Sequence, residues 1–209
     1  RVELKRSPAS LAHFVGCLKN KNTLFSALLA AVSMMIVHGT VFSFTSTLAE
    51  DIGAGALMLS ILSMVFTLVQ ILSTGFIKSS FIKNGRRSLQ LGFGFLLMSI
   101  YLLILAFAAH TYMLLIGQII AGFAFALLNS LLMSECVRGV PAGEKTTAMG
   151  IYQAIYGIGM TLGPVYMGKA LGSALGGRGG CMIFAGFVAL IALAVPVFSY
   201  RSARIDKAR

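Results

Sequence analysis

Long stretches without a charged side chain divide the sequence into apolar blocks. The block at 88–134 is too long for one helix across a bilayer, which takes roughly 20 residues. Its break falls at Ala109-His110-Thr111, where the apolar run is interrupted. The pattern therefore predicts six membrane-spanning segments, at about 22–49, 52–77, 88–108, 112–134, 146–168 and 179–200.

Each predicted span is expected to be an α-helix. Lipid offers no water to the backbone, so every backbone N–H and C=O group must be bonded within the segment or a closed barrel. The expected fold class is all-α, with an integral membrane domain of six transmembrane helices over residues 22–201. Residues 202–209 are expected to form a tail.

The first 21 residues are predicted to be a linker before the membrane domain. Four apolar residues recur there at helical spacing and predict a short amphipathic helix on the membrane surface. These residues are Leu11, Phe14, Val15 and Leu18. The helix either links two membrane domains or is simply an interfacial entry segment.

Basic residues divide unevenly between the two sides of the predicted membrane domain. With the N-terminus on side one, 15 of the 17 Lys and Arg residues fall on that side, and only Lys169 and Arg178 fall on the other. An excess of Lys and Arg marks the cytoplasmic side. Both termini are therefore expected in the cytoplasm, with the protein in a bacterial or archaeal inner membrane.

The net charge of +11 does not require a nucleic-acid partner, because the basic loops suit anionic lipid headgroups. Hydrophobic residues make up 57% of the chain and charged residues 11%. In soluble domains about 45–50% of the residues are hydrophobic and about 25% are charged. This composition excludes a soluble enzyme, a secreted domain and a disordered tail.

The sequence holds no recognisable catalytic or metal-binding motif. It lacks a Gly-x-Ser-Gly with a downstream His, a His-Glu-x-x-His and a phosphate-binding loop. The cysteines Cys17, Cys136 and Cys181 fit neither a disulfide framework nor a metal site. We therefore expect no catalytic residue, no metal and no cofactor, and a protein that is not an enzyme.

Several polar side chains fall inside the predicted spans. His38 lies past the middle of the first span, where an ionisable group is a functional candidate. It either carries a proton or stays neutral and bonds between helices. The uncharged amides and hydroxyls either line an aqueous path or join helices. Glu135, at the end of the fourth span, pairs with Arg138, gates the inner mouth, or is simply solvated.

The fifth span combines glycines with a proline. Gly159 and Gly163 form a small-xxx-small pair that lets two helices approach closely, and Gly157 stands nearby. Pro164 removes a backbone donor and favours a kink. The segment is interpreted as a hinge; static tight packing is the alternative.

The loop between the second and third spans resembles a signature of the major facilitator superfamily, Gly-x-x-x-Asp-Arg-x-Gly-Arg-Arg. Gly85, Arg86 and Arg87 match its end, whereas Ile82 and Lys78 stand where the signature has Asp and its leading Gly. With the six spans, the basic linker and the Gly-Pro of the fifth span, the chain resembles the C-terminal half of such a transporter, suspected to be of the drug or metabolite efflux type.

The resemblance implies one half of the superfamily fold, a 3+3 inverted repeat that rocks against an N-terminal six-helix half. That half lies on the same chain or is replaced by a second copy. The arginines of the loop would anchor it to helix ends or lipid phosphate. Faces of the first, second, fourth and fifth spans would line a cavity, with the expected lining residues His38, Phe42, Thr45, Gln70, Asn129, Gln153 and Tyr156.

The expected function is secondary active transport of a small molecule by alternating access, in the form of proton-coupled efflux. Two alternatives stay open. One is a symporter or uniporter for a sugar or other metabolite. The other is a stand-alone six-span binding or scaffold protein that acts as a dimer.

Overall fold

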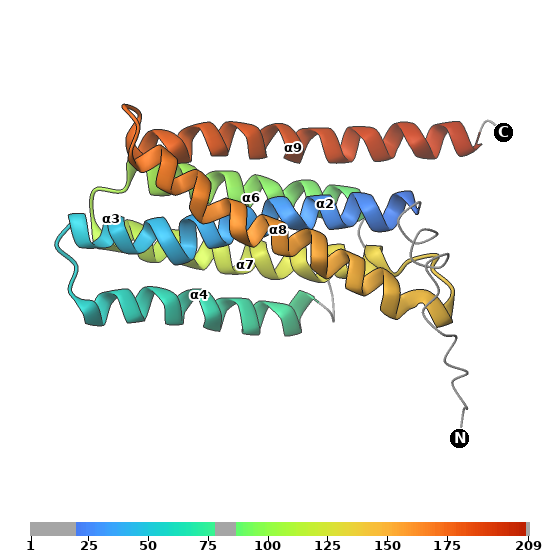
Figure 1. Ribbon diagram of the computed structural model, residues 1–209, viewed down its shortest axis with the longest axis horizontal. Helices are drawn as coiled ribbons and strands as arrows, with labels where there is room; N and C mark the ends of the chain where they lie inside the picture. Colours follow the sequence, from blue (N-terminus) through green and yellow to red (C-terminus); the bar gives the residue numbers. More distant parts are fainter. Residues whose placement is uncertain (1–19, 78–86, 208–209) are drawn as a thin grey trace, which may run out of the picture.

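The computed structural model describes residues 20–77 and 87–207, and this part of the chain is an all-α bundle of long helices (Figure 1). The predicted amphipathic helix and the loop residues Gly85 and Arg86 lie outside the described residues. The expected all-α fold class is confirmed.

The first crossing is one continuous rod of three segments. It comprises α2 (Lys21–Ile36), the π-helix η1 (Val37–Phe44) and α3 (Thr45–Asp51). The side chain of Asn20 caps its start by accepting a hydrogen bond from the backbone N–H of Asn22 at 3.0 Å. The amino-acid pattern does not indicate this π-helix.

The remaining elements include one helix over each of the other predicted spans. They are α4 (Ala56–Phe76), α6 (Arg87–Phe107), α7 (Thr111–Cys136), the short 3₁₀ turn η3 (Ala142–Glu144), α8 (Lys145–Leu171) and α9 (Gly176–Lys207). Helix α9 extends beyond its predicted span into the residues predicted as a tail, because a helical backbone does not have to end where the apolar stretch ends.

Five helices of the described chain are long and apolar enough to cross a membrane: the rod Lys21–Asp51, α4, α6, α7 and the Gly176–Val197 part of α9. Helix α8 has 27 residues and is long enough, but it carries several polar residues and glycines. At roughly 1.5 Å per residue it is about as long as α7, which has 26 residues.

The helices run up and down between two ends of the bundle (Figure 1). Helices α2, α6 and α8 begin at one end, where Lys21, Arg87, Arg138 and Lys145 also lie; we call this the basic end. The hydroxyl of Thr23 donates to the carbonyl of Cys136 at 3.0 Å there, which joins the start of α2 to the end of α7.

Small residues let the helices approach closely. A Cβ on Gly122 of α7 would lie 2.7 Å from the carbonyl oxygen of Phe66 in α4, and one on Gly92 of α6 would lie 2.6 Å from Pro196 of α9. Lipid tails are as apolar as the helices, so this close van der Waals packing holds a membrane bundle together.

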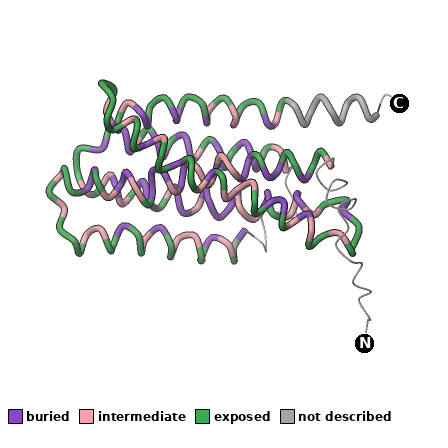
Figure 2. Tube along the Cα trace, viewed as in Figure 1, coloured by how far each residue is buried: buried purple, intermediate pink, exposed green. Residues whose placement is uncertain are grey.

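Helix α4 is the least buried of the membrane-length helices that the structure describes. Only 11% of its most apolar stretch is buried, against 56–61% for the first crossing, α6 and α7. Figure 2 shows α4 mostly exposed along one edge of the bundle, where it packs against α7. One side of the bundle is therefore left uncovered along α4.

Candidate functional site

The π-helix η1 carries two of the predicted lining residues near the middle of the first crossing. Its wider turn is seen where the backbone N–H of Thr45 bonds to the carbonyl of Thr40, five residues earlier. Short π segments inside α-helices are rare overall, but those that occur are often at functional sites. Here the segment presents His38, which is partly exposed, and Phe42, whose exposed fraction is 50%.

A series of rings runs from η1 across α4 to α7. The ring centroids of His38 and Phe42 are 5.4 Å apart. The rings of Phe42 and Phe66 meet in a T-shaped contact with centroids 5.6 Å apart, and Phe66 stacks on Phe125 at 6.1 Å. The exposed ring of Phe42 therefore contacts the buried ring of Phe66, which is 1% exposed and in turn stacks on Phe125, which is 6% exposed.

Gln70 and Asn129 stand one helical turn away from this ring series. Each stands four residues after a ring of the series, Gln70 after Phe66 and Asn129 after Phe125, so each lies on the same helix face one turn nearer the basic end. Both amide residues are partly exposed. Because α4 and α7 run in the same direction, both amides lie on the basic-end side of the rings (Figure 1).

Thr45 does not share this exposed position. It is 2% exposed, and its hydroxyl donates to the carbonyl of Thr40 at 2.8 Å. The same hydroxyl lies 3.2 Å from the phenol oxygen of the buried Tyr101 in α6. The structure thus places Thr45 inside the bundle, in a polar contact between the first crossing and α6.

Gln153 and Tyr156 form a separate group on α8. Gln153 is exposed, and the partly exposed Tyr156 packs its ring on that of Tyr152, with centroids 5.5 Å apart. They precede Gly159, which packs on Ala31, so they lie about 15 Å nearer the basic end than His38. The structure does not bring them into contact with the ring series.

The glycines of α8 pack backbone against backbone on the first crossing. A Cβ on Gly159 would overlap the carbonyl oxygen of Ala31, and one on Gly163 would overlap that of Met35. A Cβ on Gly157 would meet nothing within 4 Å. Gly159 and Gly163 therefore lie where α8 and the first crossing approach closely, and Gly157 does not. Pro164 lies on the exposed side of α8, and the helix continues through it.

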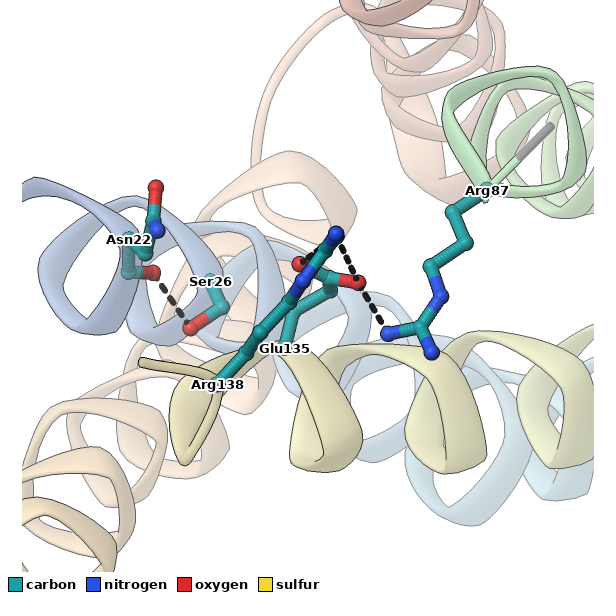
Figure 3. Close-up of polar contacts among 5 residues, drawn as sticks. All are labelled: Asn22, Ser26, Arg87, Glu135 and Arg138. Atoms are coloured by element: carbon teal, nitrogen blue, oxygen red, sulfur yellow. Dashed lines mark hydrogen bonds and ion pairs between the residues drawn. The ribbon is translucent and has the colours of Figure 1, made fainter. Parts of the chain in front are cut away.

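An ion cluster joins α6 and α7 at the basic end (Figure 3). A guanidinium nitrogen of Arg87 lies 2.5 Å from Oε1 of Glu135, and Arg138 donates to the two carboxylate oxygens at 3.3 and 3.4 Å. The Glu135 side chain is only 18% exposed. Of the three predicted loop residues, Arg87 thus begins α6 and pairs with Glu135. Pairing of Glu135 with Arg138 was one of the three alternatives for this carboxylate, and the structure shows that contact too.

A cavity of about 430 Å³ opens beside this cluster, between α2, α6 and α7. It combines charged, hydroxyl, amide and apolar side chains. Its lining residues are Asn22, Phe25, Ser26, Leu29, Arg87, Ser88, Leu91, Leu132, Glu135 and Arg138. The hydroxyl of Ser26 bonds to the backbone carbonyls of Asn22 and Thr23, so it does not point a free donor into the cavity.

Comparison with known proteins decides the family. The sequence model described as Major Facilitator Superfamily matches residues 23–208, which is nearly the whole chain. The chain belongs to the major facilitator superfamily. No curated protein matches it. The superfamily assignment and the long apolar helices together make it a multi-pass membrane protein of a transporter superfamily.

Two features of this superfamily member are not predicted from the sequence. One is the support behind Phe42, because Phe66 contacts Phe42 and stacks on Phe125. Helix α4 also carries a polar stripe that repeats every three or four residues. Its members are Ser60, Ser63, Thr67, Gln70 and Thr74, and the four hydroxyls donate to the carbonyl one turn earlier. That spacing was visible in the sequence.

Proposed function

We propose that this chain supplies one half of a secondary active transporter that exports a drug-like or metabolite molecule in exchange for protons by alternating access. The observation that carries the proposal is the partly exposed ring series, in which His38 and Phe42 stand midway along a crossing beside the amides of Gln70 and Asn129. Such a mixture of rings and sparse polar groups is typical of pockets for small molecules.

The uncovered side of α4 favours a second half as partner. Ser60, Ser63 and Thr67 are exposed there, and small hydroxyl residues are enriched where membrane helices pack on each other. The second half is a further six-helix domain of the same protein or another copy of this chain. With its partner in place, the ring series would lie between the two halves, near the midplane, where transporters of this architecture bind substrate.

The glycine packing and the ion cluster support motion of this half as one body. Gly159 and Gly163 hold α8 on the first crossing, while Glu135 holds α6 to α7 at the basic end. In this proposal the basic end faces the cytoplasm of a bacterial or archaeal cell, as the distribution of Lys and Arg favours. The protein performs no covalent chemistry on its substrate.

The test is transport by the full-length protein in proteoliposomes. A lipophilic cationic dye is loaded, and a proton gradient is imposed in either direction. The proposal expects dye to move against the direction of the protons. Dye or sugar that moves with the protons would indicate a symporter instead, and transport that ignores every gradient would indicate a uniporter. A protein that moves no solute at all would support a binding or scaffold role.

A further inference from the structure

The ring of Phe42 is held in place while half of its surface stays open. Its edge-to-face neighbour Phe66 is 1% exposed, and Phe125 behind that ring is 6% exposed. Buried side chains are fixed by close packing. Phe42 therefore offers a supported aromatic surface rather than a freely rotating side chain.

The imidazole beside Phe42 has a defined hydrogen-bonding direction. Nδ1 of His38 lies 3.2 Å from the backbone carbonyl oxygen of Met34. A carbonyl oxygen only accepts, so Nδ1 carries the hydrogen in this contact, and in the neutral ring Nε2 is left as an acceptor. Among the residues that the structure describes, none bonds to Nε2.

These two groups form one subsite, and their chemistry indicates which ligand groups it favours. The centroids of the two rings are 5.4 Å apart, so one small molecule reaches both. The face of a phenyl ring attracts other rings and cations. The Nε2 lone pair attracts an N–H donor, and both features disfavour an anion.

We propose that His38 and Phe42 form a substrate subsite for an aromatic ring that carries an amine, with the ring packed on Phe42 and the amine N–H donated to Nε2 of His38. This inference rests on the proposed transport function and specifies its substrate class. The apolar blocks around the subsite contain no Asp or Glu, so the amine is recognised by a lone pair and a ring face rather than by a carboxylate.

The test is equilibrium binding of tryptamine, an indole with a primary amine, to the full-length protein in detergent. Hexylamine supplies the donor without the ring, and indole-3-acetate supplies the ring with an anion in place of the amine. Tryptamine is expected to bind about tenfold more tightly than either, since ring packing and one hydrogen bond each contribute up to about tenfold.

Three variants assign the effect to the two residues. Phe42→Leu keeps an apolar group without the ring, and His38→Phe keeps a ring without the acceptor. Each is expected to weaken tryptamine binding about tenfold. His38→Gln restores an acceptor oxygen and should recover part of the loss. The matched control is Phe107→Leu, on α6, whose phenylalanine is 59% exposed and takes no part in the ring series.

Equal affinity for tryptamine and hexylamine, or unchanged binding in Phe42→Leu, would overturn the subsite. Failure to bind tryptamine at millimolar concentrations would overturn it as well. These outcomes differ from failure of the proposed function. Exchange of a non-aromatic solute for protons would support the transport function and contradict the subsite. Tryptamine binding without any gradient-driven transport would support the subsite and contradict the transport function.

Discussion

Gly39 of η1 and Gly163 of α8 pack backbone against backbone: a Cβ on Gly39 would lie 2.7 Å from the carbonyl oxygen of Gly163. The same packing continues where Gly159 meets Ala31, one helical turn earlier on α8. No side chain stands between the two helices at these points. Any added atom must push them apart.

Gly159→Ala is therefore expected to lower the stability of the bundle by about 1–3 kcal/mol, the usual cost of overpacking. It should also reduce transport, and Gly159→Leu should reduce transport further. The matched control is Gly157→Ala, two residues away, where an added Cβ meets nothing within 4 Å. The control should be neutral or slightly stabilising, because alanine favours helix over glycine. Thermal unfolding in detergent measures the stability of Gly159→Ala and of Gly157→Ala. Equal melting temperatures for these two variants would contradict this packing.

Glu135→Gln is expected to loosen the contact between α6 and α7 at the basic end. The carboxylate accepts from two arginines and is only 18% exposed, so its loss should cost about 1.5–3 kcal/mol. The control is Glu50→Gln, an exposed acidic residue at the end of the first crossing. Denaturant or thermal unfolding compares the stability of the Glu135→Gln and Glu50→Gln variants. A Glu135 variant as stable as the control would show that the cluster is only a solvated helix end.

The polar contact between Thr45 and Tyr101 should appear as coupling in a double-mutant cycle. Thr45→Val and Tyr101→Phe each remove one hydroxyl of a pair 3.2 Å apart, with both side chains at most 2% exposed. Because the two hydroxyls share one hydrogen bond, the double variant should lose about 0.5–1.5 kcal/mol less than the sum of the single variants. Strict additivity would mean that the two hydroxyls do not interact.

His38→Ala is expected to change how transport depends on pH. Met34 and Phe42 contact the imidazole, and neither side chain titrates. A proton on Nε2 removes the acceptor that the subsite offers. Transport by the variant should therefore vary less with pH. A pH profile identical to that of the unaltered protein would leave His38 a structural residue.

The helices and the glycine packing could be predicted because lipid imposes them. Bilayer thickness sets the helix length, and Gly159 and Gly163 one turn apart indicate a close approach before any partner is known. The inward-facing residues were harder to predict. Membrane helices are apolar on all sides, so the pattern did not show that Thr45 faces inward while Phe42 faces outward.

The π-helix and the support behind Phe42 depend on tertiary packing. The sequence Val37–Phe44 contains no residue that requires a wider turn, and Phe66 and Phe125 come together only because α4 packs on α7. Gln153 and Tyr156 were grouped with His38 because all are polar or aromatic residues in spans. Their separation along α8 follows from the level at which α8 meets the first crossing.

The most direct measurement of the central claim is the accessibility of residue 42 to water. Phe42→Cys is made in a background in which Cys17, Cys136 and Cys181 are alanine, and vesicles are treated with a membrane-impermeant maleimide. If the ring series lines a transport cavity, this cysteine will be labelled, and substrate will protect it. The control Leu193→Cys on α9, where leucine is 69% exposed, will face lipid and stay unlabelled. If neither cysteine reacts, the uncovered face meets lipid rather than a water-filled path, and the transport account is contradicted.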